Sequence, residues 1–194
     1  IGVGESKIAE LIHEWEMHLP RNIKLAYLPQ PGIVRLRLST INENYNESII
    51  EMNHQVELLH KIIPDIIFGY DDITMEEVVG NMLKESSSTI STAESCTGGY
   101  IAHLITRISG SSDYYKGSVI SYSNNIKINQ LNVSKNTIDR YGVVSREVIE
   151  QMATGGRNLL KTDYCIATSG IAGPKGGTKD KPVGTVWIAI ATPN

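Results

Sequence analysis

The densest cluster of chemically useful side chains in the sequence is the run Glu94-Ser95-Cys96-Thr97-Gly98-Gly99. Two hydroxyl groups, a thiol and two glycines fall where a predicted strand leads directly into a predicted helix. The first N–H groups of a helix have no partner within it, and glycines let a ligand approach the backbone closely. This turn therefore suits a phosphate, or the oxyanion that develops when Ser95 attacks a carbonyl group. The alternative is that Ser95 or Thr97 only caps the helix.

A second polar cluster, Ser121-Tyr122-Ser123-Asn124-Asn125-Ile126-Lys127, follows the end of the next predicted strand. A lysine that is removed from water can lose its proton near neutral pH and act as a base. Tyr122 and Lys127 could thus form a proton shuttle. The alternative is that Asn124 caps a helix and that Lys127 lies on the solvated face of that helix.

A third cluster follows a further buried strand and comprises Ser169-Gly170-Ile171-Ala172-Gly173-Pro174-Lys175-Gly176-Gly177-Thr178. Its four glycines indicate backbone positions with positive φ or close contact with a ligand, although a flexible surface loop has the same composition. All three clusters follow the C-terminal ends of predicted strands in one domain. Such ends meet at one edge of an open α/β sheet, so we expect the clusters to form one site.

Other kinds of catalytic site lack the necessary residues or spacing. The turn at Ser95 is neither a GxSxG nucleophile elbow nor a GK[ST] phosphate-binding loop. Of the five histidines, only His103 lies in the C-terminal part, on the helix that starts beside Ser95, which argues against a Ser-His-Asp triad. No set of Asp, Glu, His or Cys residues has the spacing of metal ligands, so we expect neither a metal nor a cofactor.

The elements that would position these clusters alternate between strands and helices. We predict strands over 88–94, 118–122, 163–168 and 183–191, and helices over 75–84, 97–108, 125–131 and 145–160. This alternation is typical of an α/β fold, here a layered α/β/α domain over residues 72–194 with a mostly parallel or mixed sheet.

The preceding residues 1–71 have a different pattern. Apolar residues at helical spacing predict helices over 5–19 and 43–63, and alternation predicts strands over 23–28, 33–38 and 65–68. The sequence therefore predicts a small α+β unit, which ends in the polar, turn-like stretch Gly69–Asp72.

Composition limits the classes of protein that fit. The chain has 194 residues, of which 41% are apolar and 20% charged, as in ordinary globular domains. No apolar run approaches the roughly 20 residues of a membrane span, and the two cysteines, Cys96 and Cys165, fit a reducing cytoplasm. The net charge is −3, and residues 1–70 hold six basic and nine acidic side chains. We therefore expect a cytoplasmic protein without a membrane or nucleic-acid partner.

Five motifs in order resemble the competence/damage-inducible protein CinA family. They are AESCTGG at 93–99, SYSN at 121–124 with Lys127, GVVS at 142–145, SGIAGPKGG at 169–177 and KPVGTVWIAI at 181–190. The resemblance covers about residues 73–194 and is to the nicotinamide-mononucleotide amidohydrolase domain at the C-terminus of such proteins. The preceding unit, with IGVGES at 1–6 and PGIVRLRLS at 31–39, is similar to their KH-like segment.

The resemblance implies hydrolysis of the carboxamide of nicotinamide mononucleotide to nicotinate mononucleotide and ammonia, by a homo-oligomer, without a metal. It implies that Ser95 is the nucleophile and that Tyr122 and Lys127 handle its proton. The residues implied in substrate binding come from all three clusters: Thr97, Gly98, Gly99, Ser123, Asn124, Ser169, Gly170, Gly173, Gly176 and Gly177. Residues 97–99 would supply backbone N–H groups, and the loop 170–177 would form a wall of the nucleotide site.

One departure from the family pattern concerns the C-terminus. The family continues past the last strand with a basic segment and a closing helix, including an arginine thought to reach the nucleotide, whereas this sequence stops at 192–194. The missing start Met and the opening Ile1-Gly2-Val3-Gly4 suggest a C-terminal piece of a longer protein. Either the C-terminal segment is absent from this chain, or this copy is impaired.

Two other functions stay open at this stage. The same pocket could hold a pyridine nucleotide without turnover, as a binding or regulatory module. The KH-like unit could bind RNA, which this fold clamps with a GxxG loop and basic flanks. Here the candidate loop is Gly2-Val3-Gly4-Glu5, a GxG followed by an acid, in an acidic unit. That match is weak.

Overall fold

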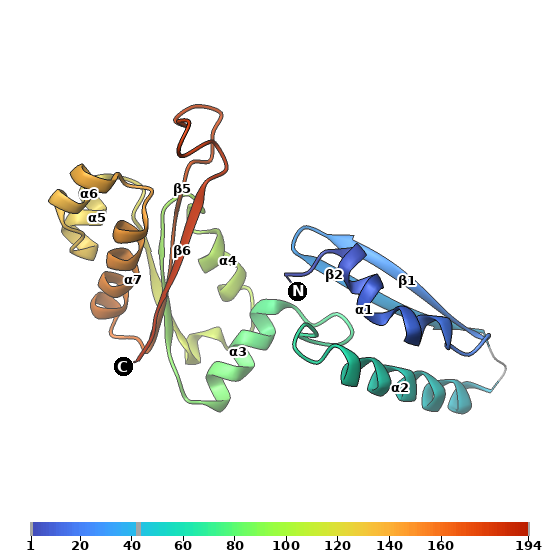
Figure 1. Cartoon of the computed structure of the whole chain (residues 1–194). Helices are drawn as coiled ribbons and strands as arrows, with labels where there is room; N and C mark the ends of the chain where they lie inside the picture. The colour runs from blue at the N-terminus through green and yellow to red at the C-terminus, as the bar shows by residue number, and fades with distance from the viewer. Residues whose placement is uncertain (1, 42–43, 194) are drawn as a thin grey trace. The chain divides into compact units, whose positions relative to one another are not determined.

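The computed structural model describes residues 2–41 and 44–193, and the chain divides into two units, residues 1–73 and 74–194 (Figure 1). The first unit contains two helices, α1 (Glu5–Met17) and α2 (Tyr45–Ile62), and an antiparallel hairpin of β1 (Ile23–Gln30) and β2 (Ile33–Thr40). Its core is formed by apolar side chains of both helices and of the residue that follows α2: Ile8, Ile12, Trp15, Leu59 and Ile63. The hairpin packs Leu25, Leu36 and Leu38 against this core.

The strand predicted over 65–68 is wrong. Residues 64–66 form a turn, in which the Ile66 N–H donates to the Ile63 carbonyl at 3.3 Å. Pro64 has no N–H for a strand ladder, and Ile66 and Ile67 instead pack against the helical core. The helix expected over 43–63 begins at Tyr45 after an Asn44 cap; its expected first residue, Glu43, lies outside the described residues.

The second unit is built on a four-stranded sheet with the order β4-β3-β5-β6. The strands are β3 (Ile90–Glu94), β4 (Tyr115–Ile120), β5 (Tyr164–Gly170) and β6 (Val186–Ala191). The first three run parallel, and β6 runs antiparallel to β5. This confirms the predicted α/β fold with a mixed sheet.

Helices cover both faces of this sheet (Figure 1). On one face lie α3 (Met75–Glu85) and α4 (Tyr100–Thr106), which pack Leu83 and Ile105 with Ile90. On the other face lie α5 (Asn124–Leu131), α6 (Lys135–Tyr141) and α7 (Arg146–Leu160), with Met152 of α7 fully buried among them. The parallel strands therefore end together at one edge, where the three polar clusters were predicted to meet.

Two helices differ from the prediction. The helix expected over 97–108 is shorter, because Gly98 and Gly99 adopt positive φ angles of 61° and 98° and keep residues 95–99 in a turn. Helix α6 was not predicted, because only Ile138 of its seven residues is buried and no apolar periodicity marks it.

No helix in the described part of the chain is long and apolar enough to cross a membrane.

Candidate active site

Ser95 and Lys127 lie in direct contact at the edge where β3 and β4 end. Lys127 is in the first turns of α5, is 2% exposed, and donates from Nζ to Ser95 Oγ at 3.0 Å. The same Nζ donates to the Ser121 carbonyl at 2.5 Å. Two residues 32 positions apart in sequence are thus brought together by the parallel pairing of β3 with β4.

Backbone contacts fix both partners of this pair. The Ser95 N–H donates to the Thr168 carbonyl at 3.0 Å, which extends the pairing of β3 with β5 by one residue. The Ser121 N–H donates to the Glu94 carbonyl at 2.7 Å, which extends the pairing with β4. Helix α5 begins with the Ser123 side chain accepting from the Ile126 N–H, and this cap directs Lys127 back toward the sheet edge.

The surroundings of Lys127 favour its neutral form. Burial lowers the pKa of Lys127 below the ordinary value for lysine, and the negative form of the neighbouring Cys96 thiol opposes this only in part. None of the ion pairs among residues 2–41 and 44–193 involves Lys127. A neutral amine 3.0 Å from a hydroxyl group can accept its proton, so this pair can generate a serine nucleophile.

The donors left open in the turn at Ser95 differ from those expected. The Gly98 N–H donates to the Ser95 carbonyl at 3.1 Å, and the Gly99 N–H donates to a Glu94 carboxylate oxygen at 2.9 Å. These two N–H groups are therefore already paired within the protein. The N–H groups of Cys96 and Thr97 make no hydrogen bond within the described ranges, and they remain as donors for an oxyanion.

Glu94 is a residue of the site that the sequence reasoning missed. Its side chain is fully buried, and both of its carboxylate oxygens accept hydrogen bonds from the turn and from the start of α4. The available signal was its position, an acid at the end of a buried strand directly before a glycine-containing helix start.

The Tyr122 side chain takes no part in the hydrogen bonds of Ser95 and Lys127. It follows β4, is 77% exposed, and makes no hydrogen bond with the described residues. Of its neighbours, Ser123 caps α5, and Asn124 is the exposed first residue of that helix. The cap is therefore provided by Ser123 rather than by Asn124.

The glycine-rich segment after β5 begins against the Ser95 turn. A Cβ added at Gly170 would lie 2.8 Å from the Thr185 carbonyl oxygen and 3.1 Å from Cys96 Sγ, so only glycine fits there. Ser169 is buried and donates to the Val143 carbonyl at 3.0 Å. It therefore links β5 to the loop before α7.

The same segment folds back on itself between β5 and β6. A Cβ at Gly173 or Gly177 would overlap Val183 or its backbone, and Gly176 has a positive φ of 93°. Two hydrogen bonds, Ile171 N–H to Thr185 O and Gly184 N–H to Ile171 O, close the segment, each at 2.9 Å. It also holds three lysines: Lys175, Lys179 and Lys181.

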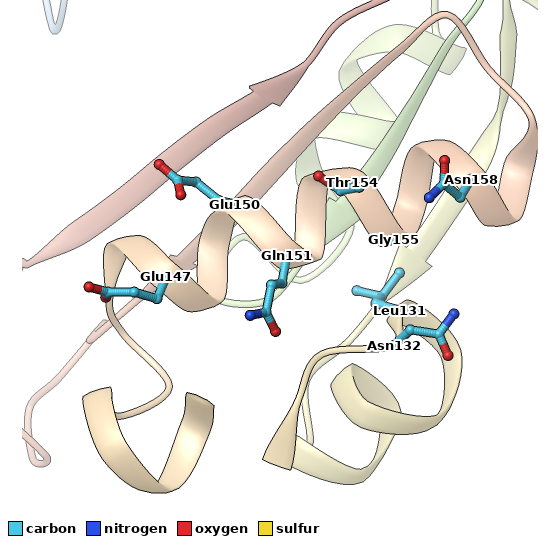
Figure 2. Close-up of a pocket in the computed structure, with 8 residues that line it drawn as sticks. All are labelled: Leu131, Asn132, Glu147, Glu150, Gln151, Thr154, Gly155 and Asn158. Atoms are coloured by element: carbon cyan, nitrogen blue, oxygen red, sulfur yellow. The ribbon is translucent and has the colours of Figure 1, made fainter. Parts of the chain in front are cut away.

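A hollow of about 410 Å³ lies elsewhere, between α7 and the end of α5 (Figure 2). Its lining residues are mostly polar and come from these two helices and from the residue that follows α5: Leu131, Asn132, Glu147, Glu150, Gln151, Thr154, Gly155 and Asn158. None of them is a predicted site residue. Among the described residues, no cluster of three or more His, Cys, Asp or Glu side chains could hold a metal ion.

The sequence and the fold match one group of known proteins. Residues 72–194 match the family described as CinA C-terminal domain, and residues 1–69 match the damage-inducible protein CinA KH domain. A CinA-like protein of Flavobacterium psychrophilum is 52% identical over 193 residues, which are 99% of this chain and 46% of that protein. One from Cytophaga hutchinsonii is 47% identical over 98% of this chain and 46% of that protein. The chain thus spans about half the length of these curated relatives.

Solved structures of similar fold carry related names. The competence/damage-inducible protein CihA from Agrobacterium tumefaciens superposes with a TM-score of 0.59 and 38% identity, over 60% of this chain and 71% of that one. A competence-damaged protein (CinA) superfamily protein from Escherichia coli superposes with a TM-score of 0.60 and 32% identity, over 66% and 77% of the two chains.

Proposed function

The chain belongs to the CinA family, and we propose that its C-terminal unit hydrolyses the carboxamide of nicotinamide mononucleotide to nicotinate mononucleotide and ammonia. The observation that carries the proposal is the 3.0 Å contact between Ser95 Oγ and the buried Lys127 Nζ. Amide hydrolysis needs a nucleophile, a base and donors for an oxyanion, and this edge of the sheet holds a candidate for each.

In the proposed reaction, neutral Lys127 takes the Ser95 proton while Oγ attacks the carboxamide carbon. The carbonyl oxygen becomes an oxyanion, which accepts hydrogen bonds from the N–H groups of Cys96 and Thr97. Lys127 then returns the proton to the departing nitrogen, and ammonia leaves an acyl group on Ser95. A water molecule, deprotonated by Lys127, attacks this ester, releases the nicotinate and restores the Ser95 hydroxyl.

The charge at this edge suits a mononucleotide. Lys175 and Lys179 are exposed, Lys181 is half-buried, and Asp180 is the single acid among residues 170–185. Lys181 is held in place by donating to the Tyr141 carbonyl at 2.7 Å. We propose that this lysine-rich segment attracts the phosphate of the substrate, while the carboxamide lies at Ser95.

The test is ammonia release from nicotinamide mononucleotide, with chromatographic detection of nicotinate mononucleotide as the second product. Ser95→Ala is the negative control, and nicotinamide, which lacks the ribose phosphate, is the control substrate. We expect release that depends on Ser95 and is much slower with nicotinamide. Calorimetric binding of the nucleotide, with no more ammonia than Ser95→Ala releases, would instead support a non-catalytic nucleotide-binding module.

A further inference from the structure

Glu94 is a buried acid that the reaction above does not use. Its side chain is 0% exposed, and none of the ion pairs in the described part of the chain involves it. Oε2 accepts from Thr97 Oγ1 at 2.7 Å, from Gly99 N at 2.9 Å and from Ile101 N at 3.1 Å. Oε1 accepts from Ala102 N at 2.8 Å and from Thr92 Oγ1 at 3.3 Å.

These five donors occupy both oxygens of the carboxylate. Burying a carboxylate costs free energy unless hydrogen bonds from the protein replace those from water. The first N–H groups of a helix also cost free energy when they are buried without acceptors. Glu94 and the start of α4 satisfy each other. Since a carboxylate has about four lone-pair sites, Glu94 has none left to act as a base.

The same contacts span the turn that contains Ser95. Glu94 directly precedes Ser95, and its side chain bonds to residues three to eight positions further along the chain. Its carbonyl oxygen also accepts from the N–H and hydroxyl groups of Ser121, at 2.7 and 3.2 Å. Ser121 in turn provides the carbonyl that holds Lys127 Nζ.

The hydroxyl group of Thr97 extends this network to β5. Thr97 donates its proton to Glu94, so it must accept the proton of Thr168 Oγ1, which lies 2.8 Å away. The ends of β3, β4 and β5 are therefore all joined through Glu94. The protein's own carboxylate fills the start of α4, so we do not expect a substrate phosphate to bind there. Of the two ligands that the sequence of this turn suggested, a phosphate and an oxyanion, only the oxyanion remains.

We propose that Glu94 is a positioning residue that holds Ser95 Oγ within reach of Lys127 Nζ. It pairs the N–H groups of Gly99, Ile101 and Ala102, whereas those of Cys96 and Thr97, beside the nucleophile, have no partner among the described residues. This role rests on the part of the proposed function that makes Ser95 a nucleophile, and not on the identity of the amide.

Glu94→Gln tests this role because glutamine has the same shape but one acceptor fewer. With its NH₂ group in the place of Oε1, the Ala102 N–H loses its acceptor. With the NH₂ group in the place of Oε2, the N–H groups of Gly99 and Ile101 lose theirs. The hydroxyl groups of Thr92 and Thr97 can rotate, but backbone N–H groups cannot, so neither orientation restores the turn.

Glu77→Gln is the matched control. Glu77 also caps a helix of this unit, α3, where its Oε2 accepts from Thr74 N at 2.7 Å and from Thr74 Oγ1 at 2.9 Å. An amide oxygen at this position still accepts from the Thr74 N–H. In the described part of the chain, the hydrogen bonds of the Glu77 side chain go to Thr74 and do not reach Ser95, Lys127 or Ser121.

The experiment is covalent labelling of Ser95 by a fluorophosphonate, followed by mass spectrometry of the intact protein. In this reaction Ser95 Oγ bonds to phosphorus, fluoride leaves, and the serine proton passes to Lys127 and then to solvent. We expect the labelling rate constant of Glu94→Gln to fall at least about 10-fold while all of the protein is still labelled in the end. Glu77→Gln should label within about 2-fold of the parent rate.

The final labelled fraction and the labelling rate constant together distinguish a positioning role of Glu94 from a role in folding. A purely structural role would lower the labelled fraction and leave the rate constant of the folded fraction unchanged, which would overturn the proposal. Labelling of Glu94→Gln at the parent rate, or a parent that does not label at Ser95, would also overturn it. If Glu94→Gln does not fold, Thr97→Val decides: it removes one donor to Glu94 and the link to Thr168, and labelling at the parent rate would count against the proposal.

This assay contains no nucleotide. Glu94-dependent labelling together with no ammonia release would therefore reject the proposed substrate and leave the positioning role standing.

Discussion

The two ends of β3 bury the same kinds of side chain but leave them in different states. At the N-terminal end, Ser91 Oγ lies 2.7 Å from Thr162 Oγ1, which donates its own proton to the Tyr164 carbonyl at 2.8 Å. At the C-terminal end, Ser95 Oγ accepts from Lys127 and has no acceptor for its proton, among the described residues, other than this lysine. Both serines are buried, at 0% and 9% exposure.

The acids at the two ends differ in what their hydrogen bonds hold together. Asp163 accepts from the N–H and hydroxyl groups of Thr89, at 2.7 and 2.8 Å, and these bonds link the residue before β3 to the residue before β5. Glu94 accepts its hydrogen bonds around the turn that contains Ser95. Buried polar side chains therefore do not mark a site by themselves. The distinguishing feature is hydrogen-bonding capacity that the protein leaves unused next to a group able to take a proton.

The largest expected effect is the contrast between Ser95→Ala and Ser91→Ala. Ser95→Ala should lower ammonia release at least about 1000-fold, or about 4 kcal/mol of barrier, without lowering the melting temperature. Ser91→Ala should lose about 1–2 kcal/mol of stability, because the buried Thr162 oxygen loses the hydrogen bond from Ser91, while the folded enzyme keeps its rate. Rates and thermal melting of both variants check the pair. A Ser95→Ala variant that keeps more than a tenth of the parent rate would remove Ser95 as the nucleophile.

Lys127→Arg should give the next largest loss. Arginine keeps the charge but does not lose its proton near neutral pH, so the rate should fall about 100-fold or more. Because burial lowers the pKa of Lys127, the parent kcat/KM should rise with pH through that lowered value and level off before ordinary lysines titrate. This rise should be absent in Lys127→Arg.

Lys135→Arg is the control for that substitution. Lys135 is exposed on α6 and pairs with Asp139 at 2.6 Å, so its replacement should leave both the rate and the pH profile unchanged. An active Lys127→Arg enzyme with the parent profile would exclude the lysine as the base.

Asp163→Asn should affect stability alone. Hydrogen bonds from Thr89 hold the pKa of Asp163 below its ordinary value. A carboxyl group whose pKa is lower in the folded than in the unfolded state stabilises the fold above the unfolded pKa, and this stabilisation is lost as the pH falls through the folded pKa. Asp163→Asn should therefore lower the melting temperature at neutral pH and reduce its change toward acid pH. A loss of ammonia release by the folded variant would show that this end of β3 also serves the site.

The sequence predicted the α/β layering and the mixed sheet because short buried runs such as β3 and β5 alternate along the chain with helical patterns such as that of α7. It also placed Ser95 and Lys127 at one edge, since the ends of parallel strands coincide. It did not predict α6, whose single buried residue leaves no periodic signal, and it assigned a strand to residues 65–68, where Pro64 and a turn prevent pairing.

Within the site, the sequence did not predict which backbone N–H groups are already paired by acceptors of the protein itself. The pattern of Gly98 and Gly99 indicated open N–H groups, but the Ser95 carbonyl accepts from Gly98 and the Glu94 carboxylate accepts from Gly99. Whether Glu94 turns inward to do so depends on side-chain orientation, which spacing does not encode. Tyr122 is next to Ser121 in sequence, yet the strand has ended by then and the side chain lies in solvent.

The smallest expected effect is that of Cys96→Ala, although Cys96 is adjacent to Ser95. The variant keeps the backbone N–H that we assign to the oxyanion. The negative form of the thiol raises the pKa of Lys127 against the effect of burial, so its removal should lower that pKa further and move the rise of kcat/KM to lower pH. At neutral pH the rate should change less than about 3-fold. The pH profile of ammonia release measures both quantities.

The opposite outcome would exchange the roles of two neighbouring side chains. A thiol at such a turn can be a nucleophile in its own right, and Cys96 is partly accessible. If Cys96→Ala were inactive, and if iodoacetamide alkylated Cys96 rapidly unless nicotinamide mononucleotide were present, the sulfur would be the attacking atom. Ser95 would then only accept a hydrogen bond from Lys127, a structural role like that of Ser91 beside Thr162. The reactive group at the C-terminal end of β3 would be the Cys96 thiol rather than the Ser95 hydroxyl.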